Sequence, residues 1–114
     1  MLPKKRKVEK SLFTGVLNKS KSFYGKNISL RVFPIESLET TKFSFVVSKK
    51  VSNKANKRNL LKRRGFSVVK NIIKHTNKGF VCVFYYKKNA LSSSYVEIEK
   101  DIKYLLTKAR ILKI

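Results

Sequence analysis

Hydrophobic residues recur at helical spacing in three parts of the chain. One apolar face lies in residues 7–18, and a second runs through residues 56–74, where Gly65 stands in line with the apolar positions. The third and most regular face follows Ser94, which forms a capping-box pattern with Glu97. Spacings of three, four and seven residues place side chains on one side of a helix, so we predict three amphipathic helices. The apolar positions, in chain order, are Leu12, Phe13, Val16 and Leu17; Leu61, Val68, Val69, Ile72 and Ile73; and Ile98, Ile102, Leu105, Leu106 and Ala109.

Three other segments have the pattern of β-strands. Residues 28–34 alternate apolar and polar side chains until Pro34 ends the run, and residues 41–48 alternate in the same way. Residues 79–86 are almost continuously apolar, which is typical of a central strand. Residues 18–26 are rich in Ser, Lys and Gly and therefore predict a loop.

The order of these elements predicts an α+β fold, in which helices pack on one small mixed sheet in the order α-β-β-(β)-α-β-α. We interpret Gly65 as the point where the middle helix approaches the sheet closely. The candidate N-caps of that helix are Ser52, Asn53 and Asn56. A length of 114 residues suits one domain, so we expect residues 1–114 to form a single RNA-binding domain with residues 1–6 as a basic extension.

The excess of positive charge is the strongest signal in the composition. Twenty-eight Lys and Arg stand against six Asp and Glu, a net charge of +22, and no acidic residue occurs between Glu39 and Glu97. Such a charge repels itself unless a polyanion neutralises it, which favours nucleic acid as the partner over an anionic membrane surface. The run Pro3–Val8 matches a short nuclear import signal, so a nuclear location is an alternative.

Few residues carry the usual chemistry of an enzyme. Cys82 stands alone in an apolar run and is interpreted as a buried structural thiol, and His75 as a cap or surface residue. One Cys and one His do not make a metal site. The sequence shows neither a carboxylate pair for metal-assisted hydrolysis nor a histidine pair for acid–base chemistry. If this chain takes part in RNA cleavage, the chemistry must therefore belong to another molecule.

The densest basic cluster runs from Lys49 to Arg64, where eight of sixteen residues are Lys or Arg. It spans a strand end, a turn and the start of the middle helix, whose free N–H groups and dipole already attract anions. This placement favours phosphate binding over a merely solvated helix face. Asn59 is either an ordinary exposed helical residue or a contact to a ribose hydroxyl, a base edge or hydrated Mg²⁺. The residues expected to bind RNA are Lys49, Lys50, Lys54, Lys57, Arg58, Asn59, Lys62, Arg63 and Arg64.

Four short motifs follow one another within this cluster. They are Ser48-Lys49-Lys50, Lys54-Ala55, Arg58-Asn59 and Lys62-Arg63. In this order the chain resembles the protein component of bacterial ribonuclease P, the partner of a catalytic RNA. The flanks are similar too, because the segment from Phe13 to Leu17 resembles the Phe-x-x-Val-Phe helix of that family. Two positions depart from the family pattern, since Phe66 stands where a further Arg is usual and Leu17 where an aromatic is usual.

The resemblance implies a left-handed β-α-β crossover through the basic helix, although general rules favour a right-handed one. It implies contact between that helix and the catalytic RNA, in which RNA and Mg²⁺ remove the 5′ leader of precursor tRNA. A cleft between sheet and helices would hold the single-stranded leader. The expected cleft residues are Phe13, Leu17, Arg31, Ser44, Val46 and Ser48, although plain core packing is the alternative for Phe13.

On this interpretation the chain is a subunit of an endoribonuclease, with no catalytic residue of its own. Its partners would be the catalytic RNA and precursor tRNA, without a membrane or a small-molecule substrate, in the bacterial cytoplasm. The main alternative is a ribosomal or other structural RNA-binding protein, which would share the charge and show no preference for a leader. A membrane-active basic protein is a second alternative, which the scattered aromatic residues disfavour.

Overall fold

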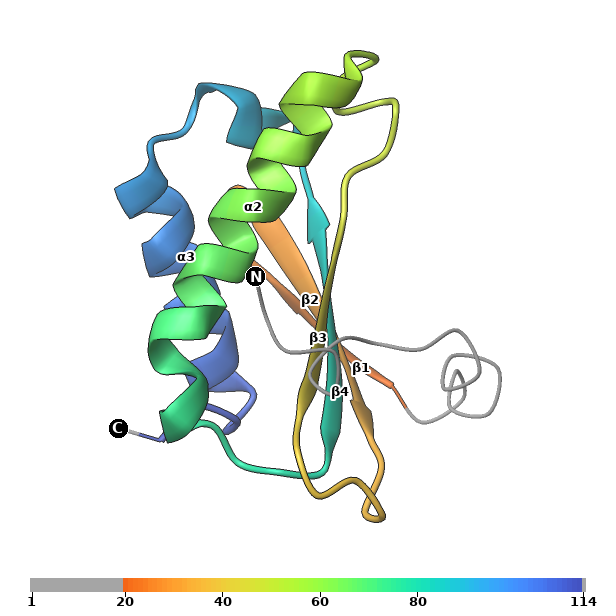
Figure 1. Ribbon diagram of the computed structural model, residues 1–114, viewed down its shortest axis with the longest axis vertical. Coiled ribbons are helices and arrows are strands. Elements are labelled where there is room, and N and C mark those ends of the chain that lie inside the picture. Colours follow the sequence, from red (N-terminus) through yellow and green to blue (C-terminus); the bar gives the residue numbers. More distant parts are fainter. Residues whose placement is uncertain (1–19, 114) are drawn as a thin grey trace.

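The computed structural model describes residues 20–113, which form a four-stranded sheet with two long helices on one of its faces (Figure 1). The predicted helix over residues 7–18 and the basic run Pro3–Val8 lie outside the described residues. The elements are β1 (Lys21–Tyr24), β2 (Ile28–Pro34), β3 (Lys42–Val46), α2 (Ala55–Ile72), the short 3₁₀ helix η3 (Ile73–His75), β4 (Phe80–Tyr86), the 3₁₀ helix η4 (Lys88–Ser92) and α3 (Tyr95–Lys108).

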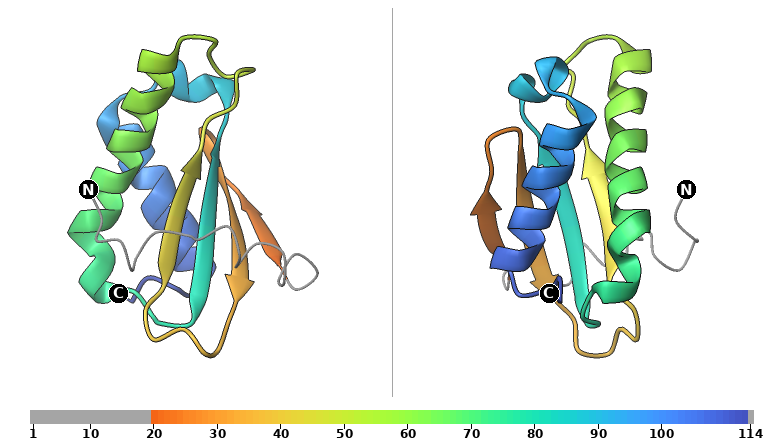
Figure 2. Two further views of the ribbon diagram at one scale, coloured as in Figure 1. Left: turned by 45° about the vertical axis from the view of Figure 1, so that its right-hand side comes forward. Right: turned by 90° about the vertical axis from the view of Figure 1, so that its left-hand side faces the viewer.

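The strands lie in the order β1-β2-β4-β3, which makes the sheet mixed, as predicted. β1 pairs with β2 and β2 with β4 in antiparallel fashion, whereas β3 and β4 are parallel neighbours joined through α2. Seen from the helix side in the right-hand view of Figure 2, both parallel strands point up and β4 lies to the left of β3. The crossover is therefore left-handed, which confirms the expectation and departs from the general right-handed rule.

Strand β1 shows that the loop predicted for residues 18–26 was wrong. Lys21, Ser22 and Tyr24 are exposed, and Phe23 alone is half-buried, so the segment lacks the alternating apolar pattern that marks a strand. Its structure comes from the backbone, which pairs with β2 from Lys21 opposite Val32 to Tyr24 opposite Ser29. An edge strand with one face on solvent needs few apolar side chains, so its composition predicted a loop.

The main core lies between the sheet and the two helices. The predicted stripe of α2 is buried at Leu61, Gly65, Val68, Val69 and Ile72, which confirms the apolar face. The ring of Phe45 on β3 lies under Gly65, stacked on Phe84 at 4.9 Å and edge-on to Phe66 at 4.8 Å between ring centroids. The Tyr86 hydroxyl on β4 donates to the Leu61 carbonyl at 2.7 Å, and burial raises the pKa of this phenol. Both contacts hold α2 close to the sheet.

Helix α3 begins as its sequence predicts. Ser94 is the N-cap, its hydroxyl accepts from the Glu97 backbone N–H at 3.2 Å, and the Glu97 carboxylate accepts from the Ser94 N–H at 3.0 Å. The Ser94 backbone N–H, and after it the Ser94 side chain, lower the pKa of Glu97 by hydrogen bonding to its carboxylate. Four apolar positions of the predicted stripe, Ile98, Ile102, Leu105 and Leu106, are buried against the sheet side.

The single thiol and the single imidazole occupy the places expected of structural residues. Cys82 is buried in the central strand β4, and this burial raises the pKa of its thiol. His75 is exposed at the end of η3. In the part of the chain that the structure describes, no helix combines the length and apolar character needed to cross a bilayer.

Gly65 yields the first testable prediction. A Cβ atom at this position would overlap the Phe45 ring, which the neighbouring aromatic rings prevent from moving away. We expect Gly65→Ala to destabilise the fold by about 1–3 kcal/mol, because overpacking outweighs the gain of roughly 1 kcal/mol in helix propensity. Chemical denaturation measures the change. Asn71→Ala at an exposed position of α2 is the control, and a Gly65→Ala protein as stable as this control would contradict the close approach.

Candidate nucleic-acid interface

The basic turn after β3 is held in place from beneath by apolar side chains. Val47 and Val51 are buried, and the Ser48 carbonyl accepts from the Val51 N–H at 3.0 Å, which closes a tight turn. Lys49 and Lys50 therefore stand at the tip of the turn, where both are exposed. The turn places two cations at the end of β3 without burying either charge.

The start of α2 differs from the prediction. Lys54 is the N-cap and its side chain makes no capping hydrogen bond, so Ser52, Asn53 and Asn56 were wrong as N-caps. Asn56 lies in the first turn, where its Oδ1 accepts from the Lys57 N–H at 2.9 Å. The Ser52 hydroxyl accepts from the Lys54 N–H at 3.2 Å, one turn earlier than a cap would. The first turn of the helix contains no acidic residue. The remaining N–H groups of the first turn, the positive end of the dipole and nearby cations all attract an anion to this place.

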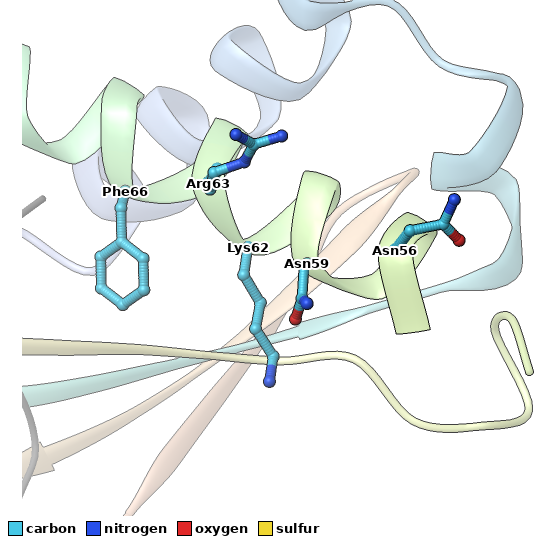
Figure 3. A pocket seen from close by; sticks show the side chains of 5 residues that line it. All are labelled: Asn56, Asn59, Lys62, Arg63 and Phe66. Carbon is cyan, nitrogen blue, oxygen red and sulfur yellow. The ribbon is translucent and has the colours of Figure 1, made fainter. Parts of the chain in front are cut away.

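The residues expected to bind RNA are distributed around α2, and only some of them share a surface. Asn59, Lys62 and Arg63 line a groove of about 650 Å³ together with Asn56 and Phe66. Figure 3 shows Asn59, Lys62 and Phe66 projecting from the helix on one side of this groove, toward the edge strand β3. A smaller hollow of about 250 Å³ continues it and is lined by Arg63, Phe66, Ser67 and Lys70. We call the two hollows together the α2 groove.

Lys57 and Arg64 lie on another flank of the helix. Their spacing of seven residues places them on one line along the helix, and Ser67, one turn after Arg64 at the border of this flank, has its hydroxyl 3.0 Å from that of Tyr95 on α3. This flank therefore faces α3. The two cations do not line the α2 groove. The density of charge along the sequence did not indicate this division between two sides of the helix.

Arg58 holds the basic turn onto the helix. It is in line with the buried positions Leu61 and Gly65, and its side chain is half-buried. Its Nη1 donates to the Ser52 carbonyl at 2.9 Å. An Arg has five N–H donors, so the guanidinium keeps donors for a phosphate while it fixes the turn. The sequence indicated the charge of Arg58 and gave no sign of this contact.

A second basic groove joins segments that are distant in the sequence. Lys49, Lys50, Ser52 and Asn53 line a hollow of about 340 Å³ together with Lys88 and Leu91 of η4. The left-hand view of Figure 2 shows η4 beside this turn at the upper end of the sheet. Sequence reasoning missed Lys88, although its position directly after a central strand parallel to β3 was a usable signal, because parallel neighbours end at the same edge.

The predicted cleft residues Arg31, Ser44 and Val46 point to the sheet face that is turned away from α2 and α3. Pairing registers place Ser22, Arg31, Val83 and Ser44 in one row across the sheet, and Tyr24, Ser29, Tyr85 and Val46 in the next. The three residues therefore do not border a cleft against α2 or α3, while their place in a leader-binding cleft stays a prediction. Ser48 follows the same alternation and is exposed, whereas Phe13 and Leu17 lie outside the described residues.

Two tyrosines on that face were missed by sequence reasoning. Tyr24 is 70% exposed, with the Lys87 ammonium 6.0 Å from its ring centroid, and Tyr85 is half-buried in the middle of the row. Arg31 is held by a hydrogen bond from its Nε to the Ser20 hydroxyl at 2.9 Å. Phe33, Val81 and Val83 form a buried apolar cluster on the same face. The face combines aromatic, hydroxyl and cationic groups, which suits a single-stranded nucleic acid.

The described part of the chain offers a poor set of ligands for a metal ion. Within residues 20–113, no three Asp, Glu, His or Cys side chains come together in a way that could hold one. Asn59 contributes an amide oxygen to the α2 groove, and its neighbours there are cations, an amide and an aromatic ring. Hard cations such as Mg²⁺ prefer carboxylate oxygens and water.

Comparison with known proteins identifies the family. The ribonuclease P family model matches residues 2–110. The ribonuclease P protein component of Pseudanabaena sp. is 29% identical over 113 residues, 98% of this chain and 97% of that protein. The Finegoldia magna protein of the same name is 32% identical over 94 residues, 82% of this chain and 80% of that one.

Solved structures share the fold. The Staphylococcus aureus RNase P protein superimposes with a TM-score of 0.84 at 17% identity, over 97% of this chain and all of that one. The Thermotoga maritima protein gives a TM-score of 0.75 at 20% identity, over 84% of this chain and 89% of its own. The uncapped basic helix, the left-handed crossover and a family match over nearly the whole sequence agree, so the chain belongs to the ribonuclease P protein family.

Proposed function

We propose that this chain is the protein subunit of a bacterial ribonuclease P. It binds the catalytic RNA and the single-stranded leader of precursor tRNA, and so promotes the Mg²⁺-dependent endonucleolytic removal of the 5′ leader. The observation that carries the proposal is the gathering of cations at one corner of the fold, where β3 ends, α2 begins uncapped and η4 adds Lys88. Family membership supplies the identity of the enzyme.

The basic corner binds the phosphates of the catalytic RNA. Lys49, Lys50 and Lys88 supply mobile ammonium groups in the second basic groove, and Lys62 and Arg63 supply cations in the α2 groove. Arg can hold a phosphate with two parallel hydrogen bonds, whereas Lys acts as a point charge. Arg58 contributes in two ways, through its charge and through its hold on the Ser52 carbonyl. Lys54 at the N-cap and Lys57 and Arg64 on the α3 flank add to the positive field.

The sheet face with Arg31, Ser44 and Val46 binds the leader. Tyr24 and Tyr85 offer rings to unpaired bases, and Arg31 offers charge to the backbone between them. Single-stranded RNA is bound in general by a cationic groove with aromatic rings on which bases stack. Val46 on this face is the last residue of β3, and the chain runs from it into the basic turn. One RNA strand can therefore run from the sheet face to the basic corner.

The chemical step belongs to the RNA. Mg²⁺ bound by the catalytic RNA supplies the charge stabilisation that hydrolysis of a phosphodiester needs. The chain contributes cations that lower the mutual repulsion of the catalytic RNA and its substrate. It works where precursor tRNA is made, in the cytoplasm of a bacterial cell.

Reconstitution tests the whole proposal. Full-length protein added to a bacterial catalytic RNA at low Mg²⁺ should accelerate leader removal, because its cations reduce the need for free metal. The measurement is single-turnover cleavage of precursor tRNA over a range of Mg²⁺ concentrations. A scrambled polypeptide of equal net charge is the control. A rate no higher than with this control would contradict a specific role.

Leader recognition separates the proposal from a structural RNA-binding role. In complex with the catalytic RNA, the protein should increase the affinity for precursor tRNA more than that for mature tRNA. Equilibrium binding of both substrates, with and without the protein, measures this difference. Tyr85→Ser should reduce the preference for precursor, while Tyr104→Ser, on the exposed face of α3, should leave it unchanged. Equal enhancement of both substrates would favour the structural role.

The salt dependence of binding tests the phosphate contacts. If Arg58 and Lys62 each contact one phosphate, replacing both by Ala should lower the slope of log affinity against log salt by roughly 1.4–1.8 in magnitude. Lys62→Ala alone should lower it by about 0.7–0.9 and leave stability unchanged. The control is the pair Lys74→Ala and Lys78→Ala, which removes the same charge beyond the far end of α2. An equal change of slope in this control would mean that net charge alone governs binding.

A further inference from the structure

Phe66 occupies an unusual place for a large aromatic side chain. It lines both hollows of the α2 groove and is only half-buried. Its ring stands edge-on to the buried Phe45 ring, at 4.8 Å between centroids and 71° between planes. One part of the ring is thus fixed against the core, and the rest is presented to the groove. A rigid, partly exposed ring is the form of a stacking surface.

The helical position of Phe66 separates it from the core residues of α2. The buried face runs through Leu61, Gly65, Val68 and Ile72, whereas Phe66 is in line with Asn59, Arg63 and Lys70 on the outward side. An aromatic residue needed only for packing would be expected to join the buried line. The ring lies instead among polar and charged neighbours.

Those neighbours have the chemistry of nucleotide recognition. Lys62, Arg63 and Lys70 supply cations along the groove, and α2 contains no acidic residue from Ala55 to Ile72. Asn56 and Asn59 supply amides that both donate and accept, as the edge of a base requires. Figure 3 shows Asn59 and Lys62 projecting on the same side of α2 as the Phe66 ring.

We propose that the α2 groove binds an unpaired nucleotide of RNA, with its base stacked on Phe66. The cations hold the flanking phosphates, and the Asn59 amide, on the same side of α2 as the Phe66 ring, is available to the edge of this base or of the next one. Two hollows of about 650 and 250 Å³, which share Arg63 and Phe66, give room for a base and the backbone on either side. The inference deepens the proposed function, on which it rests for the identity of the polyanion. It adds a stacking surface for a base to a helix on which Asn59 alone was considered for a contact other than phosphate.

A single tryptophan makes the stacking measurable. The chain contains no Trp, so Phe66→Trp creates one fluorophore at the proposed site. Single-stranded RNA of about ten nucleotides, within the usual size of such sites, should quench this fluorescence by stacking. An abasic strand of equal length and charge, bound to saturation as judged by anisotropy, should leave it unquenched. Equal quenching by both strands, or none by either, would overturn the proposal.

A second variant keeps the apolar volume and removes the aromatic face. Phe66→Leu should weaken binding of the same RNA by roughly fivefold or more, the lower range for base–aromatic stacking. The slope against salt should stay unchanged, because no charge is lost. Circular dichroism and thermal melting verify folding, and Tyr104→Leu controls for loss of an exposed aromatic. Unchanged affinity in folded Phe66→Leu would sink the base site, while weaker binding by Lys62→Ala would still support the phosphate contacts.

Discussion

The close approach of α2 to the Phe45 ring is the contact on which the rest of the structure depends. Gly65 lets the helix backbone lie directly over that ring, which is itself stacked on Phe84 in the central strand. The Tyr86 hydrogen bond to the Leu61 carbonyl fixes the same helix one turn earlier. Because α2 is so placed, its outward face forms a groove beside β3, and its uncapped start meets the basic turn. If the helix lay a few ångströms farther from the sheet, its cations would be exposed on an isolated helix and would not line a groove beside β3.

The distribution of charge follows from the same arrangement. The described acidic residues lie away from the basic corner: Glu36 and Glu39 are in the loop before β3, at the opposite end of that strand from Lys49 and Lys50. Those of α3 serve local structure. Glu97 closes the capping box, and Asp101 accepts from the Asn27 N–H at 2.7 Å. The positive electrostatic potential around α2 is therefore not neutralised by the described acidic residues, so it attracts an external polyanion strongly.

The sequence predicted those elements in which local pattern and tertiary packing agree. Ser94 and Glu97 predicted the start of α3 because a capping box is a local signal, and the alternation through Phe43 and Phe45 predicted β3. β1 escaped prediction because its partner, and not its composition, makes it a strand. The binding surface was only half predictable. Charge density marked the segment from Lys49 to Arg64, but the contact of Arg58 with Ser52 and the meeting with Lys88 depend on how the chain turns in space.

The strand order has a consequence for the synthesis of the protein. Among the described strands β4 comes last in the sequence, yet it lies between β2 and β3 in the sheet. Until β4 emerges, β3 has no neighbour in the sheet and α2 has no complete surface to cover. The basic segment from Lys49 to Arg64 is thus synthesised before the strand that organises it. A nascent chain therefore presents its clustered positive charge before the sheet is complete. Rapid completion of the sheet shortens the time in which this segment can bind RNA non-specifically.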